Sequence, residues 1–419
     1  MTSGVRFLAN TPTPFPPRAT GRLILIGGIL LIAACLRTPV TSVAPIVTQI
    51  RESFALSTAA AGALTTLPLL AFALVSPLAA QLARRQGIEK ALFAALAVMI
   101  AGALLRAIDQ IACVYLGTFV LGAGIAVGNV LLPSLLKRDF PGRIAAMTAA
   151  YVVVMGMVAA LGSAGIVPLT EALQGNWRLS LVLLSTLPLL AMLCWLPQIT
   201  THRHTGGPGA AGILHRGSIW RSPLAWQVTL FLGMNSFIYY IAVGWLPAMI
   251  TETGYSAAYA GSLHGLMQLA TAVPGLLLAP VIARMKDQRL LACATGLVTL
   301  VSLAGLALWP AGVVVWTVLL GVGTGAAMIL GLAFISLRAA ESHQAAALSG
   351  MAQCVGYLLA AVGPMLMGAL HDLAGSWYWP LLICSLCAGI MGLLGFLCGA
   401  DRQIGVHRNR TGHDREPGR

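Results

Sequence analysis

The sequence predicts an all-α membrane protein with twelve transmembrane helices in two six-helix halves, and three observations lead to this prediction. The chain of 419 residues is 58% hydrophobic and only 9% charged, whereas a soluble domain carries about 25% charged residues. Its long apolar runs hold many of the 46 glycines, which permit close packing of membrane helices. Short patterns of the first half also return in the second half at a nearly constant distance.

A helix that spans the bilayer needs about 20 mostly apolar residues, and twelve stretches of the chain meet this requirement. We place them at 22–48, 57–82, 88–107, 112–136, 144–169, 177–197, 224–250, 256–283, 289–309, 312–336, 345–370 and 377–399. The polar, proline-rich tail 1–21 precedes the first helix and has no cleavable signal. The flexible segment 198–222 links the halves 22–197 and 223–399, and 400–419 forms the second tail.

The basic residues are distributed unevenly between the two sides of the membrane. Nearly all of the 25 lysines and arginines fall in the tails, the linker and alternate loops, whereas Arg51, Arg106 and Arg178 fall on the other side. Cytoplasmic loops carry an excess of Lys and Arg. We therefore expect a multi-pass protein of a bacterial-type inner membrane with both termini in the cytoplasm. This topology explains the formal net charge of +13 without a nucleic-acid partner.

An internal repeat relates the two halves. The stretch Ser57–Gly62 matches Ser256–Gly261 about 200 residues later, and Gly122-Ala123-Gly124 matches Gly321-Val322-Gly323 at the same offset. Repeats of this kind are typical of secondary transporters, whose sites lie near the bilayer midplane between the repeats.

Arg37 is a full positive charge deep within the first predicted span, about 22 Å along a helix from Arg22. At helix-centre depth an arginine costs roughly 2.5–3.5 kcal/mol on insertion scales, so it usually faces a cavity and has a function. No Asp or Glu falls at the centre of any predicted span, and an arginine without an acidic partner favours an anionic or electron-rich ligand. The alternatives are that backbone carbonyls freed at Pro39 pair with Arg37, or that it snorkels outward.

Further polar residues lie within the spans, several of them in pairs one helical turn apart that share a helix face. The substrate contacts that we expect are Arg37, Asn129, Asn235, Tyr239 and His264. Secondary candidates are Thr65, Thr66, Gln268, Gln353 and Tyr357. For each uncharged candidate the alternative is a hydrogen bond that holds the bundle together. His264 is either a proton carrier or substrate donor, or a neutral structural residue.

Other function classes lack their usual sequence features. The glycine-rich runs follow no strand and carry no Gly-Lys-Ser/Thr, so ATP use is not supported. The eight cysteines lie mostly in apolar runs, and Cys384-x-x-Cys387 has no accompanying histidine, so we expect no metal or other cofactor. A membrane enzyme would need clustered carboxylates or a nucleophile with a base, and a sensor would need a soluble domain. A channel is a third alternative.

Several stretches of the sequence are specific enough to be compared with known protein families. In the first half they are Leu36–Thr38, Thr41–Pro45, Leu64–Pro68, Gly128–Pro133 and Lys137–Pro141. In the second half they are Trp226–Gly233 and Gln344–Gln353, together with Ile219–Trp226 and Ser262–Leu266. From Arg22 to Asp401 the chain resembles the cyanate and 2-nitroimidazole transporter family of the major facilitator superfamily, and the last two stretches favour the 2-nitroimidazole branch.

The resemblance implies the major facilitator fold and transport of a small planar, nitrogen-rich or anionic solute. We expect alternating access by two rocking halves. The lack of a carboxylate at the centre of any predicted span allows a facilitator without coupling, or proton coupling through His264 or the substrate. A facilitative channel or uniporter for another small organic anion is the alternative. One departure concerns the superfamily's Gly-x-x-x-Asp-Arg-x-Gly loop, in which Arg84 stands here at the acidic position. Glu89 and Asp139 are the residues that would replace this acid.

Overall fold

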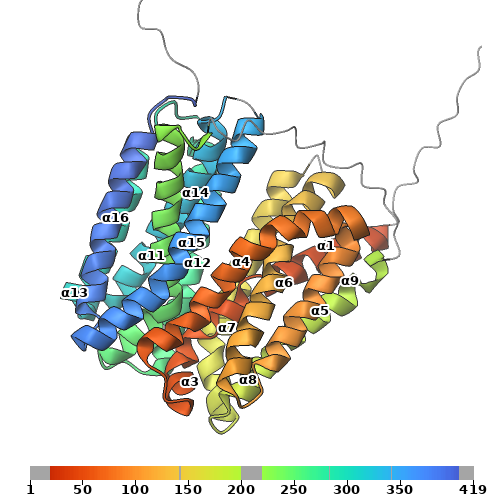
Figure 1. Cartoon of the computed structure of the whole chain (residues 1–419), viewed down its shortest axis with the longest axis vertical. Helices are drawn as coiled ribbons and strands as arrows, with labels where there is room; N and C mark the ends of the chain where they lie inside the picture. The colour runs from red at the N-terminus through yellow and green to blue at the C-terminus, as the bar shows by residue number, and fades with distance from the viewer. Residues whose placement is uncertain (1–18, 141–142, 200–218, 283, 341, 405–419) are drawn as a thin grey trace, which may run out of the picture.

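The computed structural model describes residues 19–140, 143–199, 219–282, 284–340 and 342–404, and its regular elements in these ranges are helices (Figure 1). The first group is α1 (Ala19–Cys35), α2 (Thr38–Thr41), the 3-10 helix η1 (Ala44–Ile46), α3 (Val47–Ser53), α4 (Thr58–Gln86), α5 (Ile88–Leu105), α6 (Ile111–Asp139), α7 (Ile144–Ala172), α8 (Trp177–Leu184) and α9 (Thr186–Ile199). The second group is α11 (Pro223–Glu252), α12 (Ala257–Ile282), α13 (Arg289–Leu308), η2 (Pro310–Gly312), α14 (Val313–Leu337), α15 (Ser342–Ala374) and α16 (Tyr378–Cys398).

The described helices confirm the all-α membrane class. Eleven helical stretches in these ranges are long and apolar enough to cross a membrane. The eighth predicted span, 256–283, corresponds to α12, a helix of 26 residues. Most of the two predicted tails and of the linker lies outside the described residues.

The first predicted span is broken rather than continuous. The helix α1 ends at Cys35, and α2, η1 and α3 continue the crossing. Pro39 has no backbone N–H, so the carbonyl of Cys35 loses its helical partner. The Thr38 hydroxyl donates to Ala34 O at 2.8 Å and satisfies one carbonyl near the break. Irregular backbone at membrane depth is tolerated only inside protein or beside a water-filled cavity, and Thr38 and Pro39 are both buried.

The two groups of helices meet along two pairs, α4 with α15 and α7 with α12 (Figure 1). At Gly62 of α4, a Cβ atom would lie 2.7 Å from the carbonyl oxygen of Pro364 on α15. At Gly261 of α12, a Cβ atom would lie 2.9 Å from the carbonyl oxygen of Ser163 on α7. Gly62 and Gly261 are counterparts in the sequence repeat, so the internal repeat extends to the contacts between the groups.

These contacts lie toward the end of the bundle that carries α3 and α8, which we call the α3 end (Figure 1). From there the α4–α15 contact extends to Phe72 and Tyr357, whose rings are 5.7 Å apart. Beyond Phe72, the side chains of Leu74 and Leu78 are 63% and 55% exposed. The two groups are therefore joined mainly at the α3 end.

Buried tryptophans hold the helices together within each group. Trp195 of α9 packs on Gly28 of α1, and its indole N–H donates to Glu89 O at 3.0 Å. Trp245 of α11 donates to Pro364 O at 2.8 Å. Both indoles thus bury a large apolar surface while their single polar group is satisfied.

Candidate functional site

Arg37 lies at the break between α1 and α2, where it meets helices of the second group. Its Nη1 donates to the hydroxyl of Thr271 on α12 at 3.4 Å. Its guanidinium carbon lies 5.4 Å from the ring centre of Tyr239 on α11, within the range of a cation–π contact. In the described part of the chain, no carboxylate lies within ion-pair distance of Arg37. Its side chain is half-buried, so its remaining donors are free for a ligand.

Two carbonyls at the break have donors other than the Arg37 side chain. Its own carbonyl accepts from the backbone N–H groups of Val40 and Thr41, each at 3.1 Å. The carbonyl of Pro39 accepts from Nη1 of Arg106 at 3.3 Å. The hydrogen bond that the Arg37 side chain makes is to the Thr271 hydroxyl, and among the described residues it makes none to the Cys35 carbonyl that Pro39 frees.

Arg106 was expected on the outer side, at the end of the span 88–107, and it is only 2% exposed. It follows α5 directly and turns back to the broken first span. Burial lowers the pKa of Arg106 to about 10, which still leaves it charged at neutral pH. The sequence gives no direct sign of this contact, because the carbonyl that Pro39 frees is that of Cys35, whereas Arg106 bonds to the carbonyl of Pro39 itself.

Aromatic side chains surround the Arg37 guanidinium. The rings of Tyr239 and Tyr240 are 5.2 Å apart with an edge-to-face angle of 75°. Tyr240 and Tyr357 both lie close enough to Arg37 to interact with it electrostatically. A cation beside the face of Tyr239, with two further tyrosines nearby, can bind a flat ligand with an electron-rich edge.

A chain of hydrogen bonds continues from Tyr239 into the protein. The Tyr239 hydroxyl donates to Oε1 of Gln268 at 2.8 Å, and Nε2 of Gln268 lies 3.2 Å from Nε2 of His264. On the other side of the ring, Nδ1 of His264 lies 2.7 Å from Oγ of Ser163 on α7. The Thr271 hydroxyl donates to Gln268 O at 2.7 Å, which connects this chain to Arg37.

The structure thus brings Arg37, Tyr239, His264 and Gln268 together with two residues that the sequence did not single out. We call these four residues, with Ser163 and Thr271, the Arg37 cluster. Thr271 follows His264 by seven residues, which places both on one helix face and could have identified it. Ser163 carried no comparable signal, because its partner lies on a helix of the other group.

Five other candidates, Thr65, Thr66, Asn129, Asn235 and Gln353, make no hydrogen bond with this cluster among the described residues. Asn235 is 3% exposed, and within the described residues its Oδ1 has no hydrogen-bond donor. Asn129 and Gln353 are exposed. Thr66 donates to Ala361 O at 2.6 Å, and Thr65 packs against Gly244. These two threonines therefore join the two helix groups.

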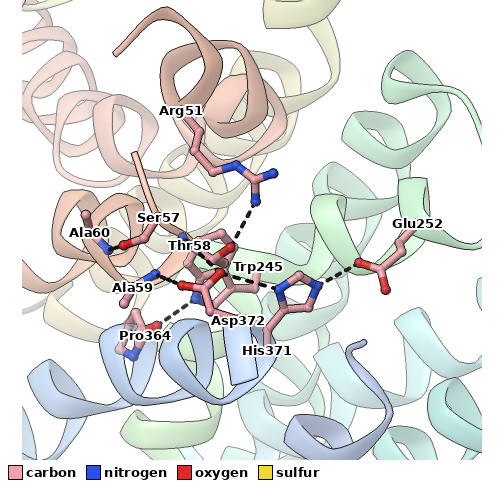
Figure 2. A network of polar contacts seen from close by, with 10 residues as sticks. All are labelled: Arg51, Ser57, Thr58, Ala59, Ala60, Trp245, Glu252, Pro364, His371 and Asp372. Carbon is pink, nitrogen blue, oxygen red and sulfur yellow. Dashed lines mark hydrogen bonds and ion pairs between the residues drawn. The ribbon is translucent and has the colours of Figure 1, made fainter. Parts of the chain in front are cut away.

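A second polar network closes the α3 end (Figure 2). The carboxylate of Asp372, near the end of α15, accepts from the backbone N–H groups of Thr58 and Ala59 at 3.2 and 3.0 Å. These amides belong to the first turn of α4, where the helix dipole favours a negative charge. His371 lies 2.9 Å from Oε2 of Glu252 and stacks on Trp377 at 4.4 Å. Asp372 therefore connects the two groups, whereas His371 braces only the second.

At the opposite end, charges are paired within each group. Arg138 donates to Glu89 at 2.6 Å and to Asp139 at 2.8 Å. Burial lowers the pKa of Arg138, but its bonds to Asp139 and Glu89 outweigh burial and raise it. In the repeat, Arg338 and Gln288 stand at the positions of Arg138 and Glu89, and Arg338 donates to Gln288. Glu89 and Asp139 thus hold Arg138.

Comparisons with known proteins agree with this architecture. The sequence profile of the Major Facilitator Superfamily matches residues 29–361 and 249–414. The chain is 53% identical to the 2-nitroimidazole transporter of Escherichia coli (strain K12) over 384 residues, which cover 91% of this chain and 97% of that protein. It is 27% identical to the cyanate transport protein CynX of the same organism over 373 residues, 87% of this chain and 94% of that protein.

A solved structure supports the fold independently. A bacterial homologue of the human lysosomal transporter Spinster, in an inward-facing and occupied conformation, superposes with a TM-score of 0.72 at 16% identity, covering 90% of this chain and 96% of that chain. The helix arrangement, the profile match and the identity to a transporter over nearly the whole length agree with one another. The chain belongs to the Major Facilitator Superfamily, and it is a multi-pass secondary transporter rather than an enzyme.

Proposed function

We propose that this transporter carries a small planar, nitrogen-rich solute such as 2-nitroimidazole, or a small anion such as cyanate, and binds it at Arg37. The observation that carries the proposal is the half-buried guanidinium of Arg37 between the helix groups, beside Tyr239 and without a carboxylate in the described part of the chain. Relatives named for 2-nitroimidazole and for cyanate support the substrate class.

Each residue of the site has a distinct role in this proposal. Arg37 holds the nitro group or the anionic atom of the substrate through charge-assisted hydrogen bonds. Tyr239 lies against the flat face and fixes its orientation with its hydroxyl. Asn235, whose buried amide oxygen lacks a donor, accepts a hydrogen bond from the substrate, and Asn129 makes contact when the halves move.

The halves 22–197 and 223–399 rock about this site by alternating access in a bacterial-type inner membrane. The α3 end faces outward and both termini lie in the cytoplasm, because the basic residues concentrate at the opposite end. The conformation described here is closed on the outside by the contacts of Asp372, Gly62 and Gly261. Binding at Arg37 therefore takes place from the cytoplasmic side in this state.

A proton-independent facilitator for another small organic anion is the second candidate. It is favoured by the absence of a carboxylate near Arg37 among the described residues, since proton relays commonly use Asp or Glu chains. Proton coupling through His264 or through an ionisable substrate is the alternative. Flux into vesicles with and without a pH gradient distinguishes them.

The main test measures uptake of labelled 2-nitroimidazole and cyanate by proteoliposomes. Losing a charged hydrogen bond costs about 1.5–3 kcal/mol, so Arg37→Ala should weaken the apparent affinity roughly 10- to 100-fold. Arg37→Lys retains the charge without the planar fork and should lie in between. Arg284→Ala, an exposed residue outside the spans, is the matched control. Unchanged uptake by Arg37→Ala would remove Arg37 from the site, and flux that internal substrate does not stimulate would indicate a channel.

A further inference from the structure

Three fully buried polar side chains connect Tyr239 with the opposite helix group. Ser163, His264 and Gln268 are each 0% exposed. Their contacts run from the Tyr239 hydroxyl through Gln268 and both nitrogens of the His264 ring to Ser163. The last contact joins α12 to α7. A buried group without a partner is disfavoured, so every member of this chain has to match a donor to an acceptor.

With the Gln268 amide oriented as in the structure, this requirement sets the direction of the hydrogen bonds. Tyr239 donates to Oε1 of Gln268, so the amide nitrogen faces His264 and donates to its Nε2. A neutral imidazole with a lone pair on Nε2 carries its hydrogen on Nδ1, which then donates to Ser163. The Ser163 hydroxyl in turn donates to Gly261 O at 3.3 Å. In this arrangement the Tyr239 hydrogen is used internally, so its oxygen can only accept from a ligand.

The same atoms allow one reversed arrangement. If Ser163 donates to Nδ1, the His264 hydrogen moves to Nε2 and donates to Oε1 of a flipped Gln268 amide. The amide nitrogen then donates to the Tyr239 oxygen, and the hydroxyl hydrogen of Tyr239 becomes free for a ligand. Mixed arrangements place two donors or two lone pairs against each other. The chain therefore has two consistent directions, and they give Tyr239 opposite roles.

We propose that Ser163 and Gln268 are positioning residues of this transporter. Acting through His264, they decide whether Tyr239 accepts or donates a hydrogen bond at the substrate site, and the proposal rests on the function proposed above. Neither residue contacts the substrate. Ser163 accepts the Nδ1 hydrogen of His264 and so holds the tautomer that makes Tyr239 an acceptor. Gln268 links the His264 tautomer to the role of Tyr239, because its amide has one donor end and one acceptor end.

The location of Ser163 connects this choice to the transport cycle. Ser163 lies on α7 and His264 on α12, so their contact exists only while these helices are together at the α3 end. When the outer side opens, His264 loses the acceptor of its Nδ1 hydrogen, and the reversed direction becomes favourable. Tyr239 then changes from acceptor to donor. A difference of this kind gives the two states different affinities for substrate, which a transporter needs if substrate is to shift its conformation.

A double-mutant cycle on the purified full-length protein tests the relay. Cyanate can only accept a hydrogen bond from Tyr239, whereas 2-nitroimidazole can also donate one. Ser163→Ala removes the acceptor of the Nδ1 hydrogen and favours the reversed direction. It should raise the affinity for cyanate relative to 2-nitroimidazole about fivefold, the effect of one net hydrogen bond. In the Tyr239→Phe background and in the Gln268→Met background, the same Ser163→Ala change should leave this ratio unaltered.

A spectroscopic readout does not depend on substrate. Nitrogen-15 spectra of labelled histidine, assigned by comparison with His264→Gln, should show the Nδ1–H tautomer in the unsubstituted protein and the Nε2–H tautomer in Ser163→Ala. Ser302→Ala, which removes another fully buried serine hydroxyl on α13, should change neither the tautomer nor the affinity ratio.

Two results would overturn the relay. One is an Nδ1–H tautomer that persists in Ser163→Ala, and the other is an affinity ratio that shifts equally in the Tyr239→Phe background. Failure of both probes to bind the unsubstituted protein would contradict the proposed substrate class, while the histidine spectra would still decide the relay.

Discussion

Asn235 has a buried side chain that the ligand-free protein does not fully satisfy. It lies on α11, one turn before Tyr239, and is 3% exposed. Its amide oxygen has no donor among the described residues, and leaving such a group unpaired costs roughly 1–3 kcal/mol. Proteins keep unsatisfied groups of this kind mainly where a ligand or a water completes them. We therefore expect that removing the polar atoms of Asn235 stabilises the ligand-free protein and weakens its binding of substrate.

Asn235→Leu, which has nearly the same shape without the polar atoms, should raise the unfolding temperature of the ligand-free protein, because the unpaired oxygen is gone. It should also reduce the additional stabilisation by 2-nitroimidazole, since bound substrate stabilises only in proportion to its affinity. Thermal unfolding in detergent measures both effects. Asn176→Ala is the control, because Asn176 caps α8 by accepting from Leu179 N, and its loss should destabilise by about 1 kcal/mol. A destabilised Asn235→Leu protein would contradict this view of Asn235.

Single residues also show what the sequence could predict. Arg37 could be identified because a charge is rare at its depth in a span, and His264 and Gln268 because polar residues one turn apart share a helix face. Ser163 could not be identified, since serine is common in membrane helices and its partner follows 101 positions later on another helix.

At the scale of elements, the length of apolar runs located the helices well. The predicted span 88–107 corresponds to α5 (Ile88–Leu105), and 112–136 to α6 (Ile111–Asp139). The interruption of the first span was missed, because the apolar content of a stretch does not report a lost backbone hydrogen bond. The contact of α15 with the first turn of α4 was also missed, because it joins elements about 300 residues apart.

The contact between Asp372 and the first turn of α4 should control closure of the α3 end. Asp372→Asn removes the charge that interacts with the helix dipole and one of two carboxylate acceptors. The two effects together should shift the population toward the state in which the α3 end is open roughly tenfold. Spin labels at Thr48 and Ala374, both exposed and in different groups, would report the change as a longer distance between labels.

The matched control for Asp372 is its counterpart in the repeat. Glu171 stands near the end of α7 as Asp372 stands near the end of α15, and both residues are exposed, but Glu171 makes no side-chain hydrogen bond within the described part of the chain. Glu171→Gln should therefore leave the label distance unchanged. An equal shift in both variants would mean that the overall charge of the α3 end, rather than the bond to α4, holds it closed.

At the scale of the whole molecule, the repeat in the sequence reappears as a repeat in the interface. Gly62 contacts Pro364 across α4 and α15, and Gly261 contacts Ser163 across α12 and α7. The sequence predicted two related halves from matching stretches such as these. It could not predict that the matching glycines are the points where the halves touch, because a glycine in a membrane helix equally serves packing within one half.

If both glycine contacts close the α3 end, a bulky side chain at either position should have the same effect. The neighbouring atoms at Gly62 and Gly261 belong to backbone and would lie within 3.0 Å of a Cβ atom, so no rotamer change can make room. Gly62→Leu and Gly261→Leu should each reduce transport at least tenfold and lengthen the distance between labels at Thr48 and Ala374. Gly165→Leu is the control, because no heavy atom outside its own helix lies within 4 Å of a Cβ there, and it should transport at the unsubstituted rate. Impaired transport with an unchanged label distance would indicate that these glycines serve another step than closure of the α3 end.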